Sequence, residues 1–377
     1  MIHLAVPNLC GNEKKYLDDC IDATFVSSVG EYVNRFEEMV AKATGSNNAV
    51  ATSSGTTGLH AALTAVGVKQ GELVIIPTFT FIASANAVAH CGATPWLMDI
   101  DEDTWCLDVA QVEKALSEKC IVEKGDLIHR ESGRRVAAIM PVYTLGNVPD
   151  MKAFRLVADK YNLPLVVDAA CAMGATLSGN YIGKLADLSV FSFNGNKTVT
   201  SGGGGAIVGD DELLKRVKHL TTTARATVEY DFDEVGFNYR MTNIQAAVGC
   251  AQMENLDLFV ERKRHIRNYY NNSFNDTLWG KFPETNGSSC WFSGIVLEQG
   301  KCVEDTRKLA EGLKKHDIEA RVFWKPVHLQ KPYVNAPKES VVRSEELWER
   351  ILTLPCSTNI TDEELGLVAE TLKKVYT

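Results

Sequence analysis

The sequence lacks the residue patterns that identify disulfide-rich and metal-binding proteins. Its ten cysteines form no C-x-x-C pair and have no regular spacing, and its eight histidines form no H-E-x-x-H motif. Disulfide frameworks and zinc sites are recognised from such spacing. We therefore expect the cysteines to be buried thiols in a reducing compartment, and we expect no metal site.

An excess of positive charge and long apolar runs are also missing. The chain has 39 lysines and arginines against 48 aspartates and glutamates, which gives a formal charge of −9. Nucleic-acid-binding proteins are more typically basic, so we expect no nucleic-acid partner. A membrane span would need a run of about 18 apolar residues, which is absent. The first residues, M-I-H-L-A-V-P-N, do not form a signal peptide, so we expect a cytoplasmic protein.

What the chain does contain is enough apolar residues for a large core. It has 377 residues, 45% of them hydrophobic, which suggests two domains. Its most informative stretch runs from Leu188 to Gly205 and reads L-S-V-F-S-F-N-G-N-K-T-V-T-S-G-G-G-G. The pattern predicts two buried strands, with a loop between them that presents the amine of Lys197. Such an amine can attack an aldehyde such as that of pyridoxal phosphate, although a loop lysine can also simply extend into solvent.

A second candidate lies at residues 52–58, which read T-S-S-G-T-T-G between a predicted strand and a predicted helix. A strand, a small-residue turn and a helix N-terminus together bind phosphate through free backbone N–H groups and the helix dipole. An ordinary Ser/Thr helix cap would give the same pattern. The turn matches neither of the glycine-rich motifs that bind nucleoside triphosphates and dinucleotides.

Predicted strands alternate with predicted helices through the first half of the chain; the strands are expected at 49–51, 73–76, 94–98, 136–141 and 163–167. This alternation predicts an α/β fold with a mostly parallel central sheet covered by helices. Ligands of such folds gather at the carboxyl ends of the strands. The two candidates above lie at strand ends, and so do Phe81 and Asp168.

The residue types at these strand ends suit one cofactor. An ionised Asp168 would keep a pyridine nitrogen protonated, although an aspartate here could also cap the next helix. Phe81 could stack on the face of the cofactor ring or pack in the core. With Lys197 and a phosphate-binding turn, the four features together indicate pyridoxal 5′-phosphate (PLP).

The second half of the chain predicts a long helix from Ile244 to about Phe274 and then a smaller α+β domain. Its elements are strands at 291–297 and 318–323 and helices at 306–316, 340–352 and 362–375. We divide the chain into an N-terminal helical segment (1–30), a large PLP-binding domain (31–275) and a small C-terminal domain (276–377).

The sequence resembles the DegT/StrS family of PLP-dependent nucleotide-sugar aminotransferases, which have the type I aminotransferase fold. The matching motifs are S-S-G-T-T at 53–57, P-T-F-T-F at 77–81, D-A-A at 168–170, S-F-N-G-N-K at 192–197 and G-F-N-Y-R-M-T-N-I-Q-A-A at 236–247. By this resemblance Lys197 forms the Schiff base with the cofactor, Asp168 contacts its pyridine nitrogen and Phe81 stacks on its ring. The residues implied to hold its phosphate are Gly55, Thr56, Thr57, Ser192 and, from a partner subunit, Asn238. The resemblance thus implies a homodimer with shared active sites.

Three residues depart from the family pattern. Val167 stands where an acidic residue is usual, Cys171 where many members have His, Gln or Glu, and Asn194 where many have His. Cys171 is the notable one, because the family uses that position to contact the cofactor's ring hydroxyl.

The resemblance is greatest to the subgroup that aminates UDP-linked 4-keto-6-deoxy-N-acetylhexosamines in bacillosamine and legionaminic acid synthesis, with L-glutamate as amino donor. The residues expected to contact this substrate are Ser28, Asn194, Arg321, Lys325 and His328. The alternatives are a different nucleotide or ring carbon, a PLP-binding regulator, and a sugar dehydratase. Dehydratases on this scaffold replace the lysine with histidine, so Lys197 disfavours that alternative.

Overall fold

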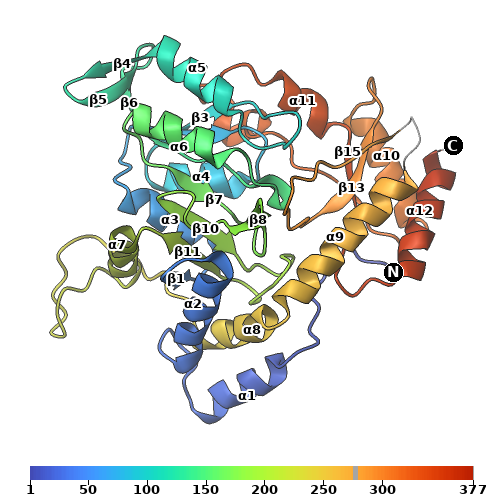
Figure 1. Ribbon diagram of the computed structural model, residues 1–377, viewed down its shortest axis with the longest axis horizontal. Coiled ribbons are helices and arrows are strands. Elements are labelled where there is room, and N and C mark those ends of the chain that lie inside the picture. Colours follow the sequence, from blue (N-terminus) through green and yellow to red (C-terminus); the bar gives the residue numbers. More distant parts are fainter. Residues whose placement is uncertain (275–278, 377) are drawn as a thin grey trace.

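A computed structural model describes residues 1–274 and 279–376 of the chain. Figure 1 shows a central β-sheet surrounded by helices and, beside it, a smaller group of C-terminal strands and helices. The long helix α9 (Leu256–Ser273) runs between the two parts (Figure 1). In the part of the chain that is described, no helix is both long and apolar enough to cross a membrane.

The central sheet is mostly parallel, as predicted. Across the sheet its strands follow the order β3 (Thr94–Met98), β2 (Leu73–Pro77), β6 (Arg134–Ile139), β7 (Val166–Asp168), β10 (Leu188–Ser192), β11 (Gly205–Gly209) and β1 (Ala49–Thr52). Two parallel bridges, Ile139 to Leu165 and Val142 to Asp168, join β6 to β7. Among these seven strands only β11 runs antiparallel to its neighbours, so the carboxyl ends of the other six share one edge.

Helices cover both faces of this sheet, because successive side chains of a buried strand point to opposite faces. In β10, Val190 belongs to one apolar cluster and Phe191 to the other. The first face carries α3 (Gly55–Ala65), α4 (Ile82–His90) and α7 (Asp211–Thr221). The second carries α2 (Glu31–Thr44), α5 (Val109–Lys119), α6 (Met151–Lys160) and α8 (Asn243–Met253), with α1 (Glu13–Asp22) packed on α8.

The C-terminal part is built on an antiparallel sheet. Its strands are ordered β12 (Trp279–Gly280), β13 (Ser293–Leu297), β15 (Ile351–Leu354) and β14 (Arg321–Val322). The helices around it are α10 (Val303–Lys314), α11 (Val342–Trp348) and α12 (Asp362–Tyr376). A third apolar cluster fills this part and includes Phe79, Leu145 and Cys171 from the first half of the chain.

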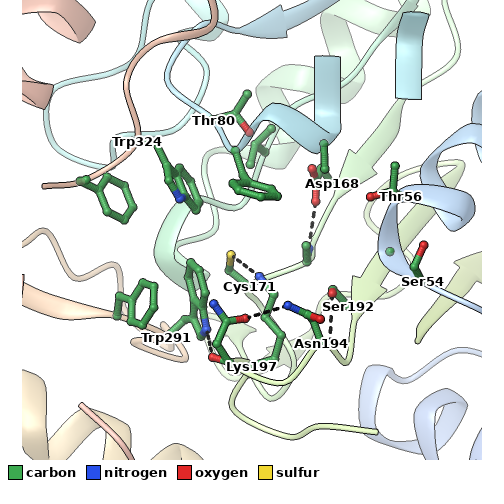
Figure 2. A pocket seen from close by; sticks show the side chains of 18 of the residues that line it. Ser54, Thr56, Thr80, Asp168, Cys171, Ser192, Asn194, Lys197, Trp291 and Trp324 are labelled. Carbon is green, nitrogen blue, oxygen red and sulfur yellow. Dashed lines mark hydrogen bonds between the residues drawn. The ribbon is translucent and has the colours of Figure 1, made fainter. Parts of the chain in front are cut away.

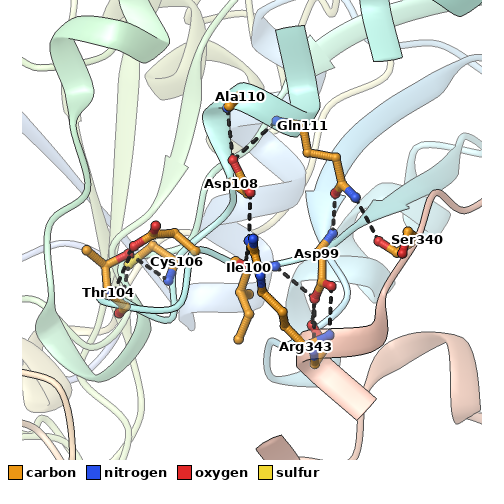
Figure 3. Close-up of polar contacts among 11 residues, drawn as sticks. Asp99, Ile100, Thr104, Cys106, Asp108, Ala110, Gln111, Ser340 and Arg343 are labelled. Carbon is orange, nitrogen blue, oxygen red and sulfur yellow. Dashed lines mark hydrogen bonds and ion pairs between the residues drawn. The ribbon is translucent and has the colours of Figure 1, made fainter. Parts of the chain in front are cut away.

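One buried carboxylate fastens the C-terminal part to the central sheet. Asp99, directly after β3, accepts hydrogen bonds at the N-terminus of α11 from the Arg343 N–H at 2.9 Å and the Ser344 N–H at 2.9 Å (Figure 3). The Arg343 guanidinium also pairs with Asp108 at 2.9 Å. Because a carboxylate is favoured at a helix N-terminus, Asp99 replaces a local cap of α11.

The structure corrects two predicted elements and adds several, among them α5 and α7. The predicted helix from Ile244 to Phe274 is two helices, α8 and α9, separated at Glu254 and Asn255. The predicted helix at 340–352 is wrong beyond Trp348, because the chain then forms β15 and pairs with β13. This pairing outweighs the weak helical preference of a short segment. The hairpin of β4 (Cys120–Glu123) and β5 (Asp126–His129) was not predicted.

Several short elements complete the description: β8 (Thr176–Leu177), β9 (Asn180–Tyr181) and the 3₁₀ turns at Thr144–Gly146, Val327–Leu329 and Lys331–Tyr333. The domain boundaries at 30/31 and 275/276 stay predictions, and the second lies outside the described residues.

Candidate active site

A cavity of about 480 Å³ opens at the carboxyl edge of the central sheet, against the C-terminal part. The N-terminus of α3, the ends of β7 and β10 and the loop after β10 all contribute to its wall, and side chains near β13 and β14 close the other side (Figure 2). Lys197, Asp168, Phe81 and Ser192, predicted from separate motifs, all line this one cavity.

Lys197 lies on the predicted loop between β10 and β11. Its Nζ atom is 3.3 Å from the Cys171 Sγ atom and 3.8 Å from the centre of the Trp291 ring (Figure 2). The glycines after the lysine allow close backbone approach. A Cβ atom on Gly205 would lie 2.6 Å from the carbonyl oxygen of Ser54, so a side chain there would push β11 away from the α3 turn.

Asp168 ends β7 and is buried at the cavity wall. One carboxylate oxygen accepts a hydrogen bond from the Ser84 hydroxyl at 2.6 Å, and the other accepts from the Ala170 N–H at 3.1 Å. Burial raises the pKa of the Asp168 carboxyl, while these two donors and the charge of Lys197 oppose that rise. A cationic group entering the cavity beside Asp168 would therefore be stabilised.

The turn before α3 supplies free donors. Ser54 caps the helix, since its hydroxyl accepts from the Thr57 N–H at 3.1 Å and the Thr57 hydroxyl accepts from the Ser54 N–H at 3.0 Å. The N–H of Thr57 is thus already bonded within the cap. Gly55 and Thr56 line the cavity, and N–H groups in a first helical turn have no intrahelical partner. These two N–H groups and the Ser192 hydroxyl lie at one end of the cavity, where their chemistry suits an anion.

Aromatic rings form the opposite side of the cavity. Phe81 is 55% exposed, so it does not pack in the core, and its ring centre lies 6.0 Å from that of Trp324. Trp324 is in turn 5.8 Å from Trp291, which stacks on Phe292 at 4.0 Å. The sequence analysis did not identify Trp291, Trp324 or Phe292. No local motif surrounds Trp291 and Phe292, and only the fold brings them to the cavity.

The structure separates the residues predicted to contact substrate. Asn194 and Arg321 line the cavity, whereas Ser28, Lys325 and His328 do not. His328 is buried and its two ring nitrogens lie 2.7 Å from the Thr78 hydroxyl and 2.8 Å from the Glu345 carboxylate. These contacts indicate a role in holding the C-terminal part in place.

The residues present fit PLP. A buried carboxylate, an amine, a ring-sized aromatic face and a set of free N–H donors surround one cavity, and they match the pyridine nitrogen, aldehyde, ring and phosphate of that cofactor.

Comparison with known proteins agrees with this geometry. Residues 7–373 match the DegT/DnrJ/EryC1/StrS aminotransferase family. The chain is 34% identical to the GDP-perosamine synthase of Vibrio cholerae, over 100% of this chain and 99% of that protein. It is 30% identical to the UDP-4-amino-4,6-dideoxy-N-acetyl-beta-L-altrosamine transaminase of Campylobacter jejuni, over 91% and 89%. A putative sugar aminotransferase from Streptococcus pneumoniae, solved in its PMP form, superposes with a TM-score of 0.88 at 25% identity, over 99% and 97% of the two chains. The chain therefore belongs to the DegT/DnrJ/EryC1/StrS family and is a PLP-dependent sugar aminotransferase.

Proposed function

We propose that the protein transfers the amino group of L-glutamate to the C4 keto group of a nucleotide-linked 4-keto-6-deoxy sugar. The observation that carries this proposal is the position of Lys197, whose amine faces the same cavity as Asp168 and the α3 turn. Asn194 and the exposed cation Arg321 line the same cavity, where they suit the hydroxyls and the diphosphate of a sugar nucleotide.

Bound PLP supplies an aldehyde that accepts an amino group and a ring that spreads the negative charge left when a proton departs. Lys197 would hold the cofactor in the resting enzyme. Once the amine of the donor has taken its place, its Nζ atom would accept and return the proton at the reacting carbon. Asp168 would keep the pyridine nitrogen protonated, and the turn of Gly55 and Thr56 with the Ser192 hydroxyl would hold the phosphate. The same residues would act in reverse order when the keto sugar is aminated.

Two observations favour acceptors with two different nucleotides. The S-F-N-G-N-K motif at 192–197 favours a UDP-linked N-acetylhexosamine. The greater identity to GDP-perosamine synthases favours a GDP-linked acceptor. Since transamination makes an amine from the matching ketone, that acceptor would be the GDP-linked keto sugar.

The test is to incubate the holoenzyme with ¹⁵N-labelled L-glutamate and each keto-sugar nucleotide, and to analyse the products by mass spectrometry and NMR. We expect ¹⁵N at C4 of the sugar and stoichiometric 2-oxoglutarate. Label at another carbon would correct the position, and 2-oxoglutarate without a labelled sugar from either acceptor would contradict the substrate class.

We also propose a homodimer with shared active sites. The segment between α7 and α8 projects from the body of the molecule (Figure 1) and exposes large apolar side chains, among them Val228 (86% exposed) and Val235 (87%). Phe25 and Val29 are exposed as well. Asn238 lies near the end of the projecting segment, is exposed and does not line the cavity of its own chain. This position suits a residue that reaches the cofactor phosphate of a partner.

We also propose a cytoplasmic location, which suits the ten cysteines, all of them free.

A further inference from the structure

Trp291 touches Lys197 and its loop at two places. The face of its ring lies 3.8 Å from the Lys197 Nζ atom, and its indole N–H donates to the carbonyl oxygen of Asn196 at 2.8 Å (Figure 2). Asn196 directly precedes Lys197, so one side chain fixes both the backbone from which the lysine extends and the end of its side chain. An aromatic face also attracts an ammonium group electrostatically.

Trp291 is itself held firmly. Its backbone N–H donates to the Leu145 carbonyl oxygen at 2.9 Å, and its backbone carbonyl oxygen accepts from the Nζ atom of Lys263 at 2.9 Å. Lys263 is fully buried, and burial lowers the pKa of its ammonium. Placing a buried lysine on a backbone carbonyl is costly, so this contact indicates that the position of residue 291 matters.

The backbone around Trp291 supports the same conclusion. Cys290, the residue before it, has φ of +51°, and Leu145, its hydrogen-bond partner, has φ of +61°. Side chains other than glycine seldom adopt these values, and such strain persists where the surrounding structure imposes it, which is most often at functional sites. Simple core filling by a tryptophan would need neither this backbone nor two contacts to one loop.

We propose that Trp291 is the positioning residue of Lys197. It holds the amine where it meets the cofactor aldehyde and, after the donor has displaced it, keeps it within reach of the proton that it must carry. This inference rests on the role assigned to Lys197 under the proposed function. A misplacement of reacting groups by about 1 Å can cost on the order of 100-fold in rate.

Two substitutions separate the contacts. W291F keeps an aromatic face but removes the indole N–H, and W291L removes both. The matched control is W348F, because Trp348 is also a buried tryptophan of the C-terminal part but does not line the cavity. The readouts are the visible circular dichroism of bound PLP without substrates, which reports a fixed cofactor orientation, and kcat and KM for glutamate.

We expect the visible dichroism to fall in the order wild type, W291F, W291L, with W348F retaining the wild-type signal. In W291L, kcat should fall about 10- to 100-fold, while KM for glutamate changes less than about twofold. W291F preserves most of the side-chain volume at position 291, so it can still be measured if W291L does not fold. Wild-type dichroism and kcat in the Trp291 variants, or equal losses in W348F and W291F, would overturn the proposal. Absence of a visible band in the wild-type protein would instead contradict the role of Lys197 itself.

Discussion

The Nζ atom of Lys197 donates to the Sγ atom of Cys171 across 3.3 Å. Burial raises the pKa of the Cys171 thiol, so the thiol is neutral at physiological pH and forms no ion pair with the amine. Asp168 supplies the negative charge of this wall and acts on Lys197 electrostatically. The thiol therefore orients the amine of Lys197 without competing with Asp168 for its charge.

The buried carboxyl of Asp168 should make the stability of the protein depend on pH. Burial raises its pKa in the folded state. An acid with a raised folded-state pKa lowers stability at pH values above both pKa values, and this cost disappears below the unfolded-state pKa of about 4. Cofactor-free D168N should therefore melt at or above the wild-type temperature at neutral pH, with the difference closing in acid.

Added PLP should reverse that order, because only the wild type gains a partner for the protonated pyridine nitrogen. Thermal melts of both proteins with and without PLP, from acid to neutral pH, would check this. If cofactor-free wild type were the more stable protein at neutral pH, a net cost of burying the Asp168 carboxylate would be refuted. Amination by D168N should be at least about 100-fold slower.

Gly205 and Gly195, on opposite sides of Lys197, should differ in their tolerance of a methyl group. In G205A the new Cβ would lie 2.6 Å from the Ser54 carbonyl oxygen, whereas Gly195 has no atom within 4 Å of its Cβ position and no positive φ. Overpacking costs about 1–3 kcal/mol, so G205A should lower the melting temperature by several degrees. It should also weaken PLP binding, because it displaces the α3 turn. G195A is the control, and equal effects of the two substitutions would contradict the role of close approach at Gly205.

Arg321 and His328 should affect the enzyme in different ways. A hydrogen bond to a charged group contributes about 1.5 kcal/mol or more, so R321A should raise KM for the sugar nucleotide at least about tenfold. H328A removes the ring contacts to the Thr78 hydroxyl and the Glu345 carboxylate, so it should lower the melting temperature while KM changes less than about twofold. Steady-state kinetics beside thermal melts would separate the two effects. A large KM change in H328A would instead indicate that His328 contacts the substrate, as the sequence predicts.

The proposed dimer can be tested on the projecting segment. Charges introduced by V228D and V235D, both at strongly exposed positions, should be harmless in a monomer but should break an apolar interface. We expect sedimentation to show a dimer for the wild type and a monomer for the double variant, with weaker PLP binding because Asn238 of a partner is lost. A wild-type monomer with normal PLP affinity would refute the shared site.

Much of this site could be predicted from sequence because its parts are local. Asp168 and Lys197 follow short apolar strands, and parallel strands bring such ends to one edge of the sheet. The cap formed by Ser54 and Thr57 was an open alternative at the same turn, and the structure shows that the cap and the free donors of Gly55 and Thr56 coexist.

The parts that could not be predicted depend on contacts between distant segments. Lys263 and Leu145 fix the backbone of Trp291 beside Lys197, and no residue spacing in the sequence predicts these contacts. Strand β15 follows directly after α11, and its pairing with β13 overrides the helical pattern assigned to it. His328 was expected to contact the substrate, but its place is set by Thr78 and Glu345 on two other segments.

The most direct test of the account is the visible absorption of the purified protein with PLP, before and after L-glutamate. The matched proteins are wild type, K197A and, as control, K152A, whose lysine is exposed on α6 outside the cavity. We expect a yellow band in wild type and K152A that glutamate bleaches and a keto-sugar nucleotide restores, and no such response in K197A. A K197A protein that cycles like the wild type, or a wild type without the band, would contradict the central role of Lys197.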